Sequence, residues 1–343
     1  MQRAAIRGIA SHLPVTELTN EQLASELGDW DAQKIYEKTG IATRHIAAVG
    51  ECASDLAVAA AEKLFASGIC RPEEIDFLLF CTQSPDYFLP ATACVIQDRL
   101  HLRTDCGAID FNQGCSGFVY GLALAKGLIE SGSARKVLLL TGETYSKLIN
   151  RRDRSVRTVF GDAGSATIIE GVDSGTELLG PFVFGTDGRG AKNLIVPSGG
   201  FRNPYNDETA VEKEDKSGNW RSDQDLFMNG PEIFNFTLSA VPAAVKATLE
   251  KAGRTMDDVD LFVLHQANRF MLDRLRTKLN IPPERFSVEL EDCGNTVSAT
   301  IPIAIERAMA RGALKEGQSL MLVGFGVGYS WAAGMMRVVE AAV

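Results

Sequence analysis

Continuous apolar runs alternate with amphipathic stretches along this chain of 343 residues. Residues 107–111 form a short apolar run that predicts a strand, and residues 112–114 predict a tight turn. Residues 116–130 have the periodicity of an amphipathic helix. Apolar strands that alternate with helices in this way are typical of parallel or mixed sheets covered by helices. The pattern therefore predicts an α/β protein.

One pattern of polar and apolar positions occurs twice in the chain. An acidic turn leads into an apolar strand at residues 72–83 and again at 256–266, after 184 positions. A second strand, at 135–142, is matched at 318–324 after 183 positions. Two matches at nearly one offset predict a thiolase-like duplication, in which two halves form a five-layer α/β/α/β/α sandwich. The expected halves are residues 1–172 and residues 173–343.

One segment departs from this alternation of strands and helices. Residues 198–225 are polar and rich in Gly, Asn and Asp. A long polar stretch of this kind is typical of a surface excursion, which is either a dispensable loop or a lid over a site.

The composition argues against several classes of function. The net charge is −9, whereas proteins that bind nucleic acid or membrane surfaces through charge carry clustered Lys and Arg. The longest apolar runs, at 137–140 and 320–323, are too short to span a membrane, and no signal peptide is visible. The seven cysteines are scattered and form no CxxC pair, which predicts neither a zinc site nor a disulfide framework. We therefore expect a cytoplasmic protein without a metal.

Cys115 differs from the other cysteines in its position. It lies between the strand predicted at 107–111 and the helix predicted at 116–130, where free N–H groups and the helix dipole favour a thiolate. Gly114 and Gly117 flank it, and we expect them to leave room for an acyl group beside the sulfur. A lone cysteine is more often a buried core residue, but this setting favours a nucleophile.

Two residues of the second half are candidates to act with Cys115. His265 follows the apolar strand at 261–264, and sheets of this type place their sites at such strand ends, although a lone histidine is more often structural. Asn295 lies in a Gly-Asn-Thr turn before a helix start at Ser298, where helix capping explains an asparagine equally well. The repeat makes Ser298 equivalent to Cys115, so a pseudo-twofold axis would bring both helix starts to one central site.

Cys115, His265 and Asn295 together resemble the active site of the thiolase superfamily, and the whole chain resembles its β-ketoacyl-acyl-carrier-protein synthase III family. The resemblance runs nearly from end to end, and the ordered set of motifs is specific although each motif alone is weak. The trio also differs from the site of elongating synthases, which use two histidines. The other motifs are KTGIATRHIA from Lys38, LPATAC from Leu89, DR from Asp153, FGDAGSA from Phe160, MNGPEIF from Met228 and GFGVGYSWAAG from Gly324.

The resemblance implies an acyltransferase that performs a decarboxylative condensation without a metal or redox cofactor. Cys115 is expected to take an acyl group from a thioester, with the backbone N–H groups of Cys115 and Val327 as the oxyanion hole. A malonyl thioester then loses carbon dioxide, and His265 and Asn295 stabilise the enolate that attacks the acyl-cysteine. The implied substrates are coenzyme A or carrier-protein thioesters, in fatty-acid or specialised lipid synthesis.

The resemblance also assigns substrate contacts, and the chain departs from several of them. The family stacks the coenzyme A adenine between a Trp and an Arg; Arg154 matches the Arg, but Lys34 occupies the Trp position. Either Trp30 is the stacking residue, or the donor is not a coenzyme A thioester. Lys38 replaces a phosphate-binding Arg, and Leu89 stands where many members have a Phe that shapes the acyl pocket. The remaining expected substrate contacts are Gly230, Phe234 and Asn268.

Two protein partners are expected. An acyl carrier protein, which is acidic, is expected to dock on a basic face of the helix predicted at 269–279, although such a charge run is ordinarily a solvated face. The family forms homodimers through the strand before the Cys115 helix, so we expect a homodimer that buries this apolar strand and directs Leu89 toward the neighbour's pocket. The expected docking residues are Arg269, Arg274, Arg276 and Lys278.

Three other functions compete with this interpretation. A relative of the same family can condense two acyl thioesters, or transfer an acyl group to an alcohol or amine, without releasing carbon dioxide from a malonyl thioester. A non-catalytic carrier-binding subunit is disfavoured because Cys115, His265 and Asn295 are all retained. A cysteine hydrolase is disfavoured because the trio serves enolate stabilisation as readily as water activation.

Overall fold

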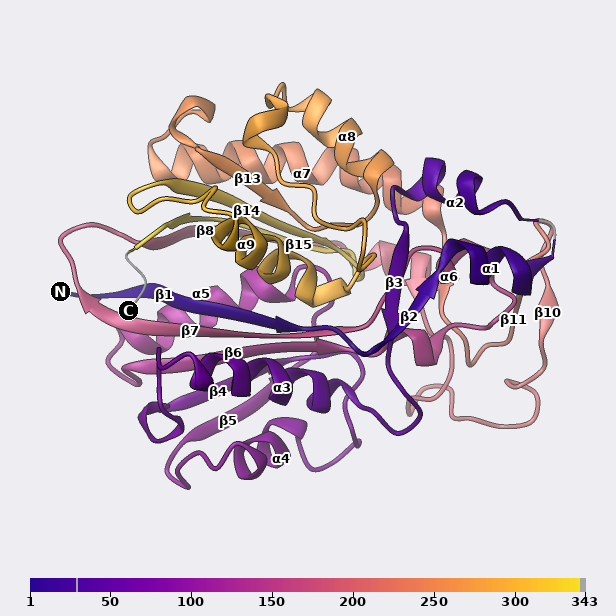
Figure 1. The fold of residues 1–343 in the computed structure, drawn as a ribbon, viewed down its shortest axis with the longest axis horizontal. Helices are drawn as coiled ribbons and strands as arrows, with labels where there is room; N and C mark the ends of the chain where they lie inside the picture. The colour runs from indigo at the N-terminus through magenta and orange to yellow at the C-terminus, as the bar shows by residue number, and fades with distance from the viewer. Residues whose placement is uncertain (29, 340–343) are drawn as a thin grey trace.

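The computed structural model describes residues 1–28 and 30–339 and contains two main sheets (Figure 1). The first sheet has the strand order β1-β7-β6-β4-β5, and the second has the order β13-β14-β15-β8. The first is built from β1 (Gln2–His12), β4 (Phe77–Cys81), β5 (Gly107–Phe111), β6 (Lys136–Glu143) and β7 (Ala163–Asp173). The second is built from β8 (Leu179–Thr186), β13 (Leu261–Leu264), β14 (Ser319–Gly326) and β15 (Ser330–Arg337).

The strand registers confirm the predicted duplication. β4 and β6 are parallel and align Phe77 with Val137, and β13 and β14 are parallel and align Leu261 with Leu320. The sequence repeat makes Phe77 equivalent to Leu261 and Val137 equivalent to Leu320, so the repeated strands pair in the same register in both sheets. In both sheets the next two pairings are antiparallel, and the outer one contains a bulge. The second sheet has only an isolated bridge to Phe286 where the first sheet has β5.

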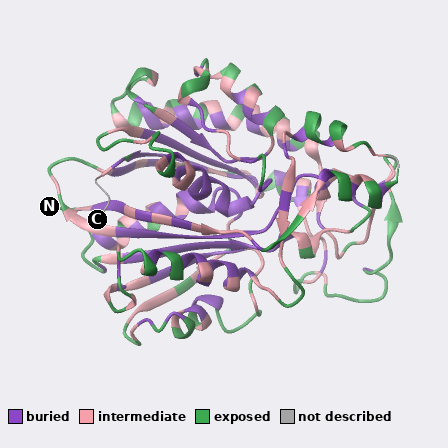
Figure 2. Ribbon diagram, in the orientation of Figure 1, coloured by how far each residue is buried: buried purple, intermediate pink, exposed green. Residues whose placement is uncertain are grey.

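Helices form three layers around the two sheets (Figure 1). The outer layer on the first sheet contains α3 (Ala53–Ala66) and α4 (Thr92–Arg99), and that on the second contains α7 (Gly230–Ala252), with α8 (Arg269–Lys278) packed beside it. α5 (Gly117–Glu130) and α9 (Thr300–Ala310) lie between the sheets. Figure 2 shows buried residues concentrated on the strands and this middle layer. The predicted five-layer sandwich is confirmed.

Smaller elements gather at one end of the sandwich (Figure 1). They include the excursion predicted at 198–225, which lies at the surface and contains a short hairpin of strands β10 and β11. Within the described part of the chain, no helix combines the length and apolar character needed to cross a bilayer. The elements at this end are β2 (Thr16–Thr19), α1 (Asn20–Leu27), α2 (Ala32–Thr39), β3 (Thr43–Ile46), α6 (Arg154–Arg157), β9 (Leu194–Ile195), β10 (Lys213–Glu214), β11 (Trp220–Arg221) and β12 (Phe227–Met228).

Candidate active site

A cavity of about 430 Å³ brings together the three predicted catalytic side chains. Cys115 comes from the turn before α5, His265 follows β13, and Asn295 precedes the short 3₁₀ turn at 297–299. Both halves of the chain therefore contribute to one site, as the repeat predicted. Most of the lining is apolar, and it also includes the predicted substrate contacts Gly230, Phe234 and Asn268.

Space beside the Cys115 sulfur is provided by a glycine on the opposite half. A Cβ atom at Gly326, the last residue of β14, would lie only 2.8 Å from Sγ. Gly326 and Cys115 both line the cavity, and Cys115 is 95% buried. A side chain at position 326 would therefore collide with the Cys115 side chain, and only glycine avoids this contact.

The expectation that Gly114 and Gly117 leave room for an acyl group is wrong. A Cβ atom at Gly114 would lie 2.5 Å from the Gln83 side-chain oxygen and 2.6 Å from a methyl group of Val327. A Cβ atom at Gly117 would collide with the sulfur of Cys81. These two glycines allow the protein's own side chains to pack closely around the turn, and they do not open a path to the nucleophile.

The protonation state of Cys115 also differs from the expectation. Burial raises the pKa of the thiol to about 12, although hydrogen bonds from the backbone of Val327 and of Cys115 itself lower it; the nearby Glu143 carboxyl raises it further. The effect of burial on the pKa is thus larger than that of the N–H groups at the helix start. The expectation of a thiolate in the resting protein is therefore wrong. The two backbone groups that bond the sulfur are those predicted to form the oxyanion hole.

We expect alkylation of Cys115 by a small uncharged haloacetamide to accelerate about tenfold per pH unit between pH 7 and pH 10. The thiolate fraction rises in this way at every pH below a pKa raised to about 12. Short labelling pulses and peptide mass spectrometry measure the rate. Alkylation of the exposed Cys94 in the same sample shows that the reagent is active. A plateau that begins near pH 7 would instead indicate a thiolate stabilised at the helix start.

His265 is oriented by a hydroxyl that the sequence analysis did not single out. Its Nδ1 lies 2.8 Å from Oγ1 of Thr300, and the same hydroxyl lies 3.0 Å from the carbonyl oxygen of Val297. Burial lowers the pKa of His265 to about 3, so the ring is neutral. The neutral imidazole and the Thr300 hydroxyl each carry one proton, so Nε2 is a donor only when the hydroxyl donates to Nδ1 in place of the Val297 carbonyl oxygen. In the sequence, this role of Thr300 is indicated by nothing more than a hydroxyl residue close after Asn295.

Asn295 is oriented by its own turn. Its Oδ1 accepts a hydrogen bond of 2.9 Å from the backbone N–H of Val297, and its backbone N–H donates to the Val159 carbonyl. Val297 adopts a φ of +55°, which is strained for a β-branched residue. The amide oxygen thus makes a local turn bond, while the amide NH₂ remains available to the cavity. The N-cap of the turn at 297–299 is Thr296, so the capping interpretation of Asn295 is wrong.

A fully buried arginine holds the backbone segment that Asn295 pairs with. The Arg44 guanidinium donates to the carbonyl oxygens of Leu18 and Thr158 and to Oδ1 of Asn20. Burial lowers its pKa to about 10, so the group remains charged at neutral pH. Its position inside the KTGIATRHIA motif gave no indication of this structural role.

A buried carboxyl group links the two helix starts. Glu143, at the end of β6, accepts hydrogen bonds from Oγ of Ser298 at 3.0 Å, from N of Gln83 at 3.1 Å and from Oγ of Ser84 at 3.3 Å. Burial nevertheless raises the pKa of Glu143 to about 8. Glu143 thus connects Ser298 to the loop after β4, and its charge also acts on Cys115, the position that the repeat makes equivalent to Ser298.

Three predicted substrate contacts lie together outside this cavity. The Trp30 ring centre is 5.5 Å from Nζ of Lys38 and 5.9 Å from the guanidinium carbon of Arg154. Trp30, the alternative stacking residue, is therefore next to the matching arginine. Leu89 is at a different place, in an exposed segment where Phe88 lies 5.9 Å from the ring of Phe201.

The basic residues of α8 do not form the single face that the sequence suggested. An α-helix has about 3.6 residues per turn, so Arg274 and Lys278 share a side with Phe270, which lines the cavity. The Arg274 guanidinium carbon lies 5.2 Å from the Phe270 ring. Arg269 and Arg276 lie on another side, where each is engaged by a carboxyl or carbonyl oxygen of the chain. The prediction of one four-residue basic face is therefore wrong.

Residues that could bind a metal are not clustered in the described ranges. Within residues 1–28 and 30–339, no group of three or more His, Cys, Asp or Glu side chains is placed to hold an ion.

Comparison with known proteins identifies one family over both halves of the chain. The family model described as 3-oxoacyl-[acyl-carrier-protein (ACP)] synthase III matches residues 109–188, and the model of its C-terminal part matches residues 249–338. A β-ketoacyl-[acyl-carrier-protein] synthase III of Caldanaerobacter subterraneus subsp. tengcongensis is 36% identical over 334 residues, which are 97% of each chain. The crystal structure of a 3-oxoacyl-(acyl-carrier-protein) synthase III is 55% identical and superposes with a TM-score of 0.97, over 98% of this chain and 100% of the other. A 3-oxoacyl-(acyl-carrier protein) synthase from Burkholderia xenovorans LB400 is 43% identical, with a TM-score of 0.90 over 98% and 95% of the two chains.

Proposed function

Because the chain belongs to the 3-oxoacyl-[acyl-carrier-protein] synthase III family, we propose that its cavity condenses an acyl thioester with a malonyl thioester through an acyl-cysteine. The observation that carries this proposal is the convergence of Cys115, His265 and Asn295 on one largely apolar cavity. The proposed steps need no metal or redox cofactor. We place the reaction in the cytoplasm, in fatty-acid or specialised lipid synthesis, with coenzyme A and carrier-protein thioesters as substrates.

The first half-reaction transfers the acyl group to Cys115. The sulfur attacks the thioester carbonyl carbon, and the negative oxygen that develops accepts hydrogen bonds from the backbone N–H groups of Cys115 and Val327. The bond between the acyl carbon and the donor sulfur then breaks. The proton of the Cys115 thiol leaves on the released donor thiol.

The second half-reaction forms the carbon–carbon bond. The malonyl group loses its carboxylate as carbon dioxide, and the electron pair passes to an enolate whose oxygen accepts bonds from His265 and Asn295. Apolar cavity walls disfavour the carboxylate more than neutral carbon dioxide, which assists this loss. The enolate carbon attacks the acyl-cysteine to give the β-ketoacyl thioester, and the Cys115 sulfur departs as a thiolate that takes a proton from water.

A product assay tests the proposed reaction directly. The protein is incubated with acetyl-coenzyme A and a malonyl carrier protein labelled at its free carboxyl group. We expect one labelled carbon dioxide for each β-ketoacyl product. Joining of two acyl thioesters, or acylation of an added alcohol or amine, without release of label would contradict the proposal and favour the related reactions of the family.

We also propose that the two halves of the chain, residues 1–172 and 173–343, are the units that were duplicated. The first sheet ends with β7 at Asp173, and the second begins with β8 at Leu179, so neither sheet takes a strand from the other side of this point. The last four residues of the second unit, 340–343, lie outside the described residues.

A homodimer is proposed to pair through β5. This strand is at the edge of its sheet, and Ile109 on it is 44% exposed in the single chain, so the burial expected for this strand requires a second chain. Phe88, Leu89 and Phe201 add an exposed apolar cluster. Burial of such surface is a standard source of association energy.

Light scattering is expected to give about twice the chain mass of 37.1 kDa. Ile109→Lys places a charge on the β5 edge and should shift the protein toward the single-chain mass, while Lys246→Ala, at an exposed site on α7, should not. A wild-type protein that is fully active as a stable monomer would contradict the proposed dimer.

The acyl carrier protein is proposed to dock beside Phe270, on the part of the predicted face that contains Arg274 and Lys278. Arg274 contacts Phe270 at the cavity, and Lys278 follows it on the same side of α8, in a chain whose net charge is −9. Steering by exposed charges weakens with salt, because the Debye length falls from about 10 Å at 0.1 M to about 3 Å at 1 M.

Reversal of both charges, Arg274→Glu with Lys278→Glu, should raise KM for the carrier protein about tenfold, and the difference should shrink at high salt. Turnover of a small malonyl thioester should stay nearly constant. Lys246→Glu, an exposed lysine on α7, is the matched control. An unchanged carrier KM in the double variant would place the docking surface elsewhere.

A further inference from the structure

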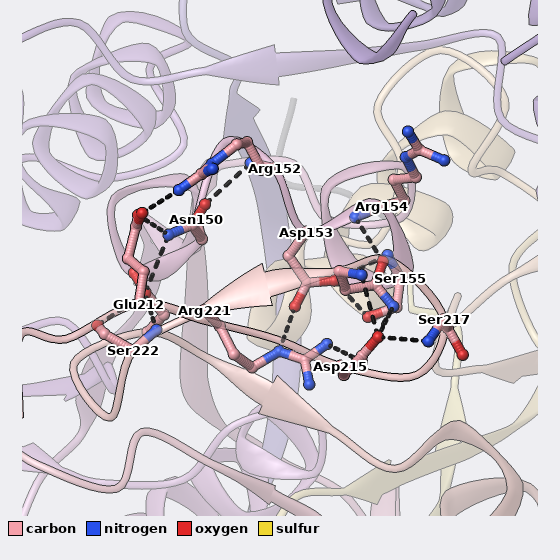
Figure 3. Close-up of polar contacts among 12 residues, drawn as sticks. Asn150, Arg152, Asp153, Arg154, Ser155, Glu212, Asp215, Ser217, Arg221 and Ser222 are labelled. Atoms are coloured by element: carbon pink, nitrogen blue, oxygen red, sulfur yellow. Dashed lines mark hydrogen bonds and ion pairs between the residues drawn. The ribbon is translucent and has the colours of Figure 1, made fainter. Parts of the chain in front are cut away.

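We infer that residues 198–225 are neither a dispensable loop nor a lid, but a fixed brace that positions Arg154 beside Trp30 for nucleotide-bearing donors. The inference rests on the proposed acylation of Cys115 and names a determinant of donor choice. Three sets of contacts carry it, and each joins the excursion to the segment 150–155, which contains Arg154 (Figure 3).

The first contact is an ion pair that is largely closed to water. Nε of Arg221 donates to Oδ2 of Asp153 at 2.7 Å, and its terminal nitrogen donates to Oδ2 of Asp215 at 3.0 Å (Figure 3). Asp153 is completely buried, and its other oxygen accepts from N of Ser155 at 2.9 Å, which caps α6. Loss of Arg221 would therefore leave a buried carboxylate unpaired at the residue immediately before Arg154.

The second contact reaches the backbone of Arg154 itself. Its N–H donates to the side-chain oxygen of Asn219 at 3.1 Å. Asn219 is buried, and its own N–H donates to Oδ1 of Asp215 at 3.0 Å. Asp215 thus holds both Arg221 and Asn219, so one carboxylate of the hairpin organises both contacts to the 150–155 segment.

The third set of contacts closes the outer side of the same segment. The Arg152 guanidinium lies 4.3 Å from the centre of the Trp220 ring and forms an ion pair with Glu212. Nδ2 of Asn150 donates to Glu212 at 2.6 Å. Residues of the excursion therefore contact the 150–155 segment on two sides through the chain's own side chains, which is the arrangement of a brace.

These contacts hold Arg154 where it and Lys38 both lie close to the indole ring of Trp30. Arg154 donates to the Leu27 carbonyl at 2.9 Å, and its guanidinium and the Lys38 ammonium are both within 6 Å of the Trp30 ring centre. An aromatic ring and a planar guanidinium stack with a heteroaromatic base, and the two cations attract phosphates. The nucleotide end of coenzyme A supplies both groups, whereas pantetheine supplies neither.

The test compares two acetyl donors that share the reacting thioester, acetyl-coenzyme A and S-acetyl-pantetheine. Intact-protein mass spectrometry measures acylation of Cys115 as a function of donor concentration. Arg221→Ala should raise the half-saturating concentration of acetyl-coenzyme A about tenfold, and it should change acylation by acetyl-pantetheine less than twofold. Arg221→Lys keeps the positive charge but lacks the second nitrogen that bonds Asp215, so it should restore part of the lost affinity for acetyl-coenzyme A. Lys216→Ala, at an exposed site on the same hairpin, should have no effect on either donor.

Each outcome decides the inference. An equal loss with both donors would show that the hairpin supports the whole cavity, and no loss with either would show that it is dispensable; both results overturn the brace. Asn219→Ala removes the acceptor of the Arg154 N–H and should give the same donor-selective loss, so it serves as the test if Arg221→Ala does not fold. Failure of the wild-type protein to be acylated by either donor would instead contradict the proposed function.

Discussion

Replacement of Cys115 by alanine should abolish acyl-enzyme formation while the fold is retained. The change removes one buried sulfur atom, and the described lining of the cavity contains no second thiol. Cys81, which packs against the same turn, is fully buried, and burial raises its pKa well above the usual range, so it is a poor substitute. Intact-protein mass spectrometry after incubation with acetyl-coenzyme A measures the adduct.

Cys94→Ala is the matched control, because Cys94 is exposed and does not line the cavity. It should be acylated like the wild-type protein. Persistence of the adduct in Cys115→Ala, confirmed by peptide mapping to another residue, would refute the proposed nucleophile. Loss of the adduct in both variants would point to a change in folding, which circular dichroism detects.

His265→Ala and Asn295→Ala should each slow decarboxylation of a malonyl thioester by a factor of about 10²–10³, as expected when one oxyanion donor is removed. Both side chains are buried and face the same cavity, so water replaces them poorly. Self-acylation of Cys115 should be affected much less, because its oxyanion is proposed to be held by backbone groups. Release of labelled carbon dioxide and formation of the acyl-enzyme, measured separately, distinguish the two half-reactions.

Thr300→Val extends this test to the orientation of His265. Valine keeps the shape but removes the hydroxyl that bonds Nδ1, so the tautomer with its proton on Nε2 loses the group that can donate to Nδ1. We expect decarboxylation to slow about tenfold, with recovery in Thr300→Ser, and ¹⁵N NMR to report the altered tautomer.

Normal decarboxylation together with defective self-acylation in the His265 or Asn295 variants would contradict the proposed division of roles between these side chains and the backbone groups.

Much of the fold follows from local patterns in the sequence. The strand predicted at 107–111 is β5, and the helix predicted at 116–130 begins one residue later because Ser116 is its N-cap. The helix predicted at 269–279 ends at Lys278 for a similar reason, since Leu279 is its C-cap. Buried strands retain their apolar character after duplication, which is why the repeated segments can be recognised in the sequence.

The site was predicted less completely, because its properties depend on contacts between distant segments. The location of Cys115 follows from its turn, but its raised pKa follows from burial that only the assembled halves produce. Gly326 and Thr300 act through a residue far away in the sequence, and neither has a local signature. The spacing of charges along α8 did contain the information that Arg269 and Arg274 point in different directions.

The exposed edge of β5 has a consequence for the life of the protein in the cell. An unpaired strand edge with apolar side chains is a template for any other strand, and a partner copy would satisfy it specifically. Newly made chains would carry this edge uncovered until they meet, and the encounter time lengthens as their concentration falls. Slow synthesis, dilution or a destabilised variant would therefore expose the chain to aggregation and proteolysis before it lost any catalytic group, so abundance, and not turnover, would be the first quantity to decline.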